Sequence, residues 1–154
     1  MKRSRQLTVL GILLVSGAIL LGGCGGGGGD RLTKDEYAAK ANAFCAAFNK
    51  ETDALGNTSG MNVTQITAAL DKLLPVEKKL IADLKALKPP ADEEATAKKA
   101  IAFGEQVYAG ETKLNAVLKA GDVTKAQKLI SEIEVPGNQA DTLFTQLGAT
   151  ECAK

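Results

Sequence analysis

The sequence TKDEYAAKANAFCAAFNKETDAL, residues 33–55, carries the clearest structural signal in this chain. It opens with a capping box, because Thr33 and Glu36 are spaced so that each side chain can accept a hydrogen bond from the other residue's backbone N–H. Apolar side chains then recur at helical spacing on one face: Tyr37, Ala41, Phe44, Phe48 and Leu55. The segment therefore predicts an amphipathic helix that ends at the loop of residues 56–60.

A second capping pair, Asn62 with Gln65, starts the next helix. Its apolar stripe consists of Ile66, Leu70, Leu73, Leu74, Leu80, Ile81, Leu84 and Leu87. Pro75 interrupts the stripe, and proline removes one backbone hydrogen bond and clashes with the preceding turn, so we expect two segments joined by a kink and facing one core. Pro89 and Pro90 end the element.

Acidic residues 92–94 favour a helix start, since negative charge stabilises the positive end of a helix. Inward residues of this third helix are Ala97, Ala100, Ile101, Val107, Tyr108, Leu114 and Val117. Gly121 stops it, and Asp122 can cap a fourth helix. Inward residues of the fourth are Ala126, Leu129, Ile130, Ile133, Ala140, Leu143, Phe144 and Leu147. Pro136 breaks or bends it, which leaves residues 124–147 as one bent helix or two.

The region 33–154 is expected to form one all-α domain. Ala, Leu, Lys and Glu are frequent, alternating strand patterns are missing, and apolar residues recur three and four positions apart. Short loops favour antiparallel packing of neighbouring helices. The sequence therefore predicts an up-down bundle of about four helices, kinked near Pro75 and Pro136.

The first residues have the features of an export signal. Lys2, Arg3 and Arg5 favour retention of this end in the cytoplasm, and an apolar run follows. That run, residues 7–21, spans roughly 22 Å as a helix, short of a hydrocarbon core of ~30 Å. The sequence LGGC that ends at Cys24 resembles the lipobox of bacterial lipoproteins. We therefore expect residues 1–23 to be a lipoprotein signal peptide, with a plain secretory signal or a membrane anchor as alternatives.

The lipobox implies that Cys24 is lipidated. Two acyl chains, of the palmitate type, suffice for stable anchoring, so the membrane is a partner through the lipid on Cys24. Residues 24–32 are predicted to be a tether, because five consecutive glycines at positions 25–29 lose much backbone entropy on ordering. Such a segment spans roughly 15 Å. The predicted location is the cell membrane, on its extracytoplasmic face.

Cys45 and Cys152 are the other two cysteines of the chain. An even pair in an exported protein predicts a disulfide, since the compartment is oxidising. The bond would fasten the C-terminal tail to the first helix and, by loop entropy, stabilise by about 4–5 kcal/mol. Two free thiols or a metal pair are the alternatives.

Several short motifs occur together: the lipobox with its glycine tether, LTKDEY leading to Cys45, LKPP at residues 87–90, AGD at 120–122, and LG at 147–148 before Cys152. In these motifs and their order the chain resembles short, alanine-rich bacterial lipoproteins of unknown function. The resemblance covers nearly the whole region after the signal. It implies a helical, disulfide-closed, surface-anchored domain and no particular activity.

The composition argues against several functions. The chain has no histidine, which removes Ser-His and Cys-His nucleophilic systems and most zinc and copper sites. It has a net charge of +1 and no basic patch, so we expect no nucleic acid partner. No glycine-rich phosphate loop follows a strand, and paired carboxylates suit helix starts or solvated faces. No catalytic, cofactor-binding or metal-binding residue is predicted, and the protein is expected not to be an enzyme.

Two functional hypotheses follow. The first is a non-catalytic envelope lipoprotein that acts as a structural or protein-interaction module, with an unknown envelope protein as partner. The alternative is a carrier of a lipid or other small apolar ligand, because kinks at Pro75 and Pro136 could leave a gap between helices.

Overall fold

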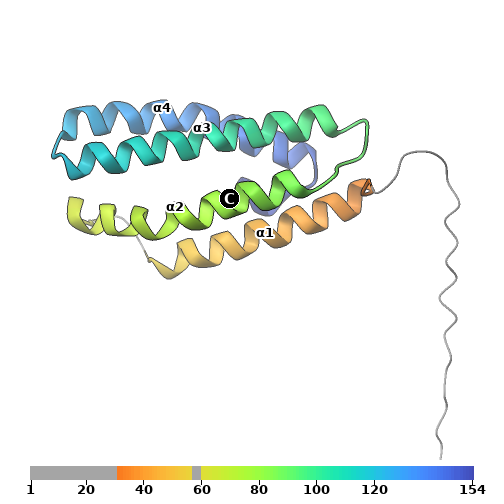
Figure 1. Ribbon diagram of the computed structural model, residues 1–154, viewed down its shortest axis with the longest axis horizontal. Helices are drawn as coiled ribbons and strands as arrows, with labels where there is room; N and C mark the ends of the chain where they lie inside the picture. The colour runs from red at the N-terminus through yellow and green to blue at the C-terminus, as the bar shows by residue number, and fades with distance from the viewer. Residues whose placement is uncertain (1–30, 57–59) are drawn as a thin grey trace, which may run out of the picture.

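A computed structural model describes residues 31–56 and 60–154 of the chain (Figure 1). The predicted signal peptide, Cys24 and most of the predicted tether lie outside these residues. Within them the chain forms four α-helices and one short 3-10 helix, and no strand. The elements are α1 (Lys34–Ala54), α2 (Val63–Ala86), α3 (Glu94–Lys119), α4 (Val123–Gln146) and η1 (Thr150–Ala153). The predicted all-α fold is confirmed.

The helix starts follow the predicted caps. Thr33 and Glu36 form the capping box of α1, and Asn62 and Gln65 form that of α2. The side chain of Asp122 accepts a backbone hydrogen bond at the start of α4. These caps satisfy N–H groups that would otherwise lack partners, so each fixes where its helix begins.

Pro75 and Pro136 each lie inside a single helix. Pro75 is exposed. Asp71, one turn earlier, is exposed as well, and its backbone carbonyl has no helical donor because proline lacks an N–H. Glu132, one turn before Pro136, is also exposed. Water can therefore solvate the freed carbonyls, and neither proline ends its helix. Residues 124–147 accordingly form one helix that ends at Gln146, and not two.

The four helices form two stacked hairpins, α1 with α2 and α3 with α4 (Figure 1). The hairpins meet where α2 packs on α3, and η1 contacts both α1 and α4. Within the described residues, no helix is long and apolar enough to cross a membrane.

The buried core falls into two clusters. The larger one lies toward the N-terminus of α1 and collects residues from all four helices and the C-terminal segment: Tyr37, Ala41, Cys45, Leu84, Ala97, Ala100, Ile101, Ala140, Phe144, Leu147 and Ala149. The smaller one consists of Leu114, Leu118 and Ala126, with half-buried neighbours from α2, α3 and α4. Along α2 and α3, Glu77 and Glu111 lie between the two clusters.

The C-terminal segment is fastened to α1. Cys45 and Cys152 form a disulfide with a Cα–Cα distance of 5.0 Å, as predicted. The side chain of Asn42 donates to the carbonyl of Gly148 at 3.0 Å and accepts from the backbone N–H of Glu151 at 2.8 Å. One covalent bond and a pair of side-chain hydrogen bonds thus close the domain.

Candidate functional site

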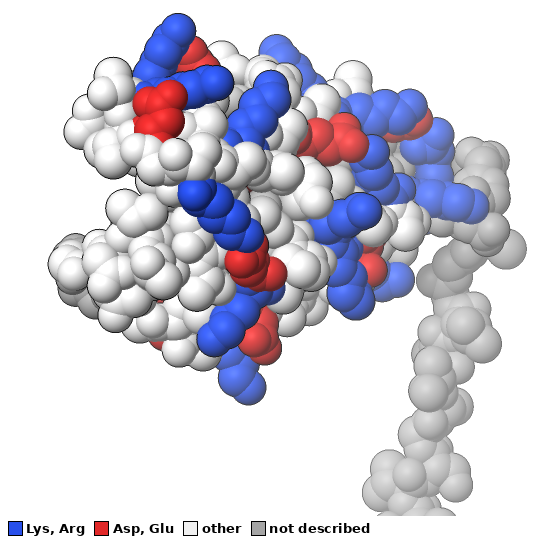
Figure 2. All heavy atoms as spheres, turned by 60° about the vertical axis from the view of Figure 1, so that its left-hand side comes forward, with Lys and Arg blue, Asp and Glu red and all other residues white. Residues whose placement is uncertain are grey.

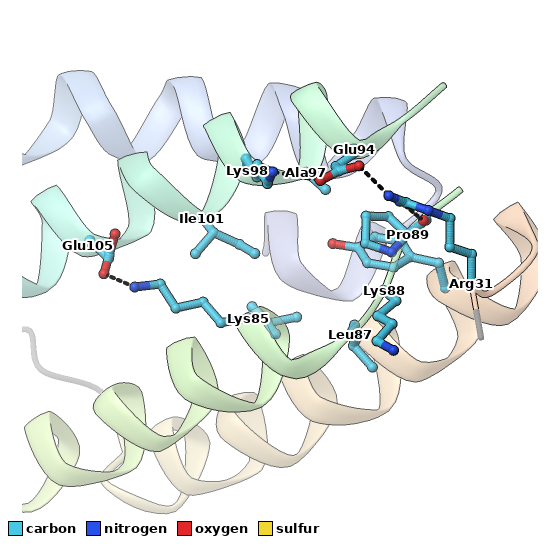
Figure 3. Close-up of a pocket in the computed structure, with 12 residues that line it drawn as sticks. Arg31, Lys85, Leu87, Lys88, Pro89, Glu94, Ala97, Lys98, Ile101 and Glu105 are labelled. Atoms are coloured by element: carbon cyan, nitrogen blue, oxygen red, sulfur yellow. Dashed lines mark hydrogen bonds and ion pairs between the residues drawn. The ribbon is translucent and has the colours of Figure 1, made fainter. Parts of the chain in front are cut away.

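A groove of about 590 Å³ lies between the start of α1, the end of α2 and the first half of α3 (Figure 3). This volume falls within the range of small-molecule sites, roughly 300–1,000 Å³. Twelve residues line the groove: Arg31, Tyr37, Leu84, Lys85, Leu87, Lys88, Pro89, Glu94, Ala97, Lys98, Ile101 and Glu105.

The floor of the groove is apolar. Leu84 of α2 is 4% exposed, and Ala97 and Ile101, one turn apart on α3, are 1% and 8% exposed. Their spacing puts all three on the inward stripes, and the small side chain of Ala97 leaves space above it. The groove is therefore a place where the core of the bundle approaches the surface.

Two clusters of charge form the rim. At one end Glu94 accepts from Arg31 at 2.6 Å and from Lys98 at 2.6 Å, and Arg31 also donates to the carbonyl of Pro89 at 3.0 Å (Figure 3). Hydrogen bonds from Lys98 and Arg31 hold the pKa of Glu94 below its usual value. At the other end Lys85 pairs with Glu105. The first cluster thus carries two cations for one anion, and the second is neutral.

Tyr37 adds a buried polar group to the lining. Its side chain is 1% exposed, and its hydroxyl has no hydrogen-bond partner. Burial raises the pKa of Tyr37, and the negative charge of Glu93 raises it further, so the hydroxyl stays protonated. An unsatisfied buried donor costs about 1–3 kcal/mol, which an acceptor atom in the groove would relieve.

The domain extends further toward the N-terminus than the sequence indicates. Leu32, within the predicted tether, packs against the larger core cluster and donates from its backbone N–H to the carbonyl of Lys88 at 2.9 Å. Arg31 is held by the Pro89 and Glu94 contacts. These contacts place the end of the tether at the rim of the groove.

A carboxyl pair forms a second polar feature. Glu77 is 8% exposed and shares a hydrogen bond with Glu111 across the α2–α3 interface, while its Oε2 has no partner. Burial, followed by the hydrogen bond and the charge of Glu111, raises the pKa of Glu77 to about 9. Asp141, whose pKa burial also raises, lines an adjacent shallow groove together with Glu111. The pair can hold a proton inside the bundle at neutral pH.

No protein-family model, curated protein or solved structure matches this chain. The function must therefore be argued from the site itself.

The structure brings two of the predicted site residues together, Cys45 and Cys152, while Cys24 lies outside the described residues. Over residues 31–56 and 60–154, no group of three or more His, Cys, Asp or Glu side chains could hold a metal ion. On the face in Figure 2, acidic side chains stand beside basic ones, in keeping with ion pairs such as Lys85 with Glu105 and Lys79 with Asp83.

Sequence reasoning missed both the groove and the buried Glu77. Glu77 had a readable signal, because it is one turn after Leu73 and Leu74 and one turn before Leu80 and Ile81, on the apolar stripe of α2. The sequence carried no such signal for the groove, because its lining combines residues 31–37 with residues 84–105, which are far apart in the chain.

Proposed function

We propose that this chain is a lipid-anchored lipoprotein of the extracytoplasmic membrane face, whose helical domain holds a small apolar or amphipathic ligand without catalysis. The observation that carries the proposal is the groove between α1, α2 and α3, with its apolar floor and its unsatisfied Tyr37 hydroxyl. Such a concave apolar site with few polar groups is the usual form of a small-molecule site.

The position of the groove agrees with anchoring. Arg31 forms part of its rim and lies near the end of the predicted tether, whose span is roughly 15 Å. In a protein lipidated at Cys24, the groove would therefore lie close to the bilayer surface. The lipobox and glycine run support lipidation, and the disulfide suits an oxidising compartment.

Native mass spectrometry of the processed lipoprotein, released gently from its membrane, tests this function. We expect a bound small molecule that is lost in Leu87→Trp, because the larger ring would fill the groove that Leu87 lines. The matched control is Leu129→Trp, which makes the same change at a half-buried position of the smaller core cluster. A ligand-free wild-type protein, or equal retention in both variants, would contradict the proposal.

A structural or protein-interaction module is the second candidate. Three large apolar side chains of α4 are exposed, Val123 at 53%, Ile130 at 46% and Val135 at 60%. Exposed apolar groups on one element favour a protein contact when they form a patch. Cross-linking in intact membranes, followed by identification of partners lost in Ile130→Glu, would favour this candidate over a ligand carrier.

A further inference from the structure

We propose that the groove between α1, α2 and α3 binds an amphiphile with one hydrocarbon chain and an anionic head group, with the head group beside Arg31 and Lys98. This inference rests on the proposed ligand-binding function and names the ligand class. It depends on the distribution of charge, the shape of the floor and the unpaired hydroxyl of Tyr37.

The charge of the rim is unequal along the groove. Glu94 is the shared partner of Arg31 and Lys98, and the neighbouring Glu93 pairs with Lys34, so three cations stand against two carboxylates at this end. A guanidinium has five N–H donors and an ammonium has three, so both groups keep donors for a further acceptor beside their contacts with Glu94 and Pro89. At the opposite end, Lys85 and Glu105 balance each other (Figure 3). An anionic group is therefore attracted to the Arg31 and Lys98 end.

The space between the two ends suits a hydrocarbon chain. Ile101 lies between the two charged ends in Figure 3, and Leu84 and Ala97 line the same groove. The methylenes of Lys85 can extend the apolar wall while its ammonium stays at the rim. A groove of about 590 Å³ lies within the size range of sites for small molecules, roughly 300–1,000 Å³. A single hydrocarbon chain with a small head group is a ligand of this size class.

Tyr37 gives the site a neutral donor. Tyr37 lines the groove, and its buried hydroxyl, which has no hydrogen-bond partner, stays protonated because burial and the charge of Glu93 raise the pKa of Tyr37. As side chains above it move aside for a ligand, an oxygen of the head group becomes its acceptor. Charge-assisted hydrogen bonds of this kind are stronger than neutral ones and favour an anion over an alcohol.

Photo-cross-linking in vesicles tests the inference with the intact lipidated protein. The processed lipoprotein is reconstituted in phosphatidylcholine vesicles that contain a diazirine analogue of palmitic acid or, in parallel, of hexadecanol. We expect the acid to label peptides that contain Leu84, Leu87 or Ile101 at least about fivefold more than the alcohol does, a ratio that needs roughly 1 kcal/mol of head-group preference. Excess inorganic phosphate should leave the labelling unchanged, because it lacks the chain.

Lys98→Glu provides the variant, and Lys128→Glu provides its control. The two lysine side chains are 74% and 78% exposed, and each pairs with a glutamate one turn away on its own helix. We expect Lys98→Glu to lower labelling by the acid about fivefold and to leave labelling by the alcohol unchanged, while Lys128→Glu changes neither. Arg31→Gln, at the second cation, should act in the same direction as Lys98→Glu.

The outcomes separate the two proposals. Equal labelling of the groove by acid and alcohol would overturn the anionic head group and keep the ligand site. If excess inorganic phosphate abolished the labelling, an anion alone would be enough for binding, and the proposed hydrocarbon chain would be overturned. Labelling spread over the molecule, unaffected by Leu87→Trp, would overturn both the ligand class and the ligand site itself.

Discussion

Glu77 is a carboxyl residue buried inside the helical bundle. It occupies an inward position of α2 between the two core clusters, where the neighbouring inward residues are leucine and isoleucine. Burial disfavours its charged form, and its hydrogen bond with Glu111 requires that the pair hold a proton. The bundle therefore tolerates a carboxyl at this position by keeping it neutral.

The raised pKa of Glu77 predicts how stability changes with pH. In the folded state the pKa of Glu77 is about 9, whereas in the unfolded chain the carboxyl releases its proton near its ordinary pKa of 4.5. The folded state binds more protons in this window, so this group makes the free energy of unfolding fall as pH rises from about 4.5 to about 9.

Glu77→Gln should remove that decline, because glutamine stays neutral and can still donate to Glu111. We expect a melting temperature raised by about 10 °C or more at pH 8 and by only a few degrees at pH 5, measured by circular dichroism. Glu132→Gln on the exposed face of α4 is the control and should show no such pH-dependent gain. A variant that is less stable than the parent at pH 8 would show that Glu77 is bound there in its charged form.

Cys24 is the predicted site of lipidation, and its replacement tests whether the protein is anchored to a membrane. Cys24→Ala should abolish fatty-acid labelling and leave an unprocessed precursor, because the lipid is attached to the cysteine sulfur. Metabolic labelling with a palmitate analogue, together with the mass of the isolated chain, checks both. Normal labelling in this variant would remove the lipoprotein assignment.

At the scale of the elements, two glycines of α3 differ in what surrounds them. A Cβ built at Gly110 would lie 2.5 Å from Cγ1 of Ile133 on α4, and one built at Gly104 would meet nothing within 4 Å. Gly110 therefore lets α3 and α4 approach closely, and Gly104 has no such role.

Alanine at these two positions should act in opposite directions. Gly104→Ala should stabilise the domain by roughly 0.5–1 kcal/mol, because glycine in a helix costs about that much relative to alanine. Gly110→Ala should destabilise it by about 1–3 kcal/mol, because the added methyl group displaces Ile133 near its branch point. Urea unfolding of both variants measures the difference. Equal stabilisation by the two alanines would mean that the helices separate without cost.

The disulfide links η1 to α1, elements at opposite ends of the domain sequence. Cys45→Ser with Cys152→Ser should lower the free energy of unfolding by about 2–5 kcal/mol and leave most of the helical content. The helices should remain because their caps and apolar stripes are local. Thermal melts followed at 222 nm check the stability, and the starting signal checks the helicity. A collapse of the helical signal at low temperature would show that the bond is needed for the fold itself.

At the scale of the whole molecule, the fold was more predictable than the site. The helix starts at Thr33, Asn62 and Asp122 could be predicted because capping is decided by residues three apart in the sequence. The pairing of Cys45 with Cys152 could be predicted because two cysteines remain besides Cys24 and the expected compartment is oxidising. The groove could not be predicted, because its lining combines the start of α1 with α2 and α3, and because Arg31 joins it from a segment that was predicted to be tether.

The domain without residues 1–24 should be soluble, monomeric and helical, and should show no hydrolytic or redox turnover. Solubility follows from removing the long apolar segment of residues 7–21 and from ion pairs such as Lys98 with Glu94 on the outer faces. The chain lacks histidine, and both of its other cysteines are in the disulfide. Size-exclusion chromatography and a panel of ester, peptide and glycoside substrates check these properties. Turnover of one of these substrates would show that the protein is an enzyme, provided that replacing a single carboxylate abolishes the turnover while the protein stays folded.

The Cys45–Cys152 bond also decides how the molecule carries mechanical load. A pull between the tether side of α1 and the C-terminal Lys154 travels along the first turns of α1, crosses the disulfide and leaves through Ala153. The covalent loop formed by residues 45–152, which includes α2, α3 and α4, lies outside that path. In a force-extension experiment, the oxidised chain should therefore lengthen only by the residues outside the loop, and the rest should become extensible after reduction.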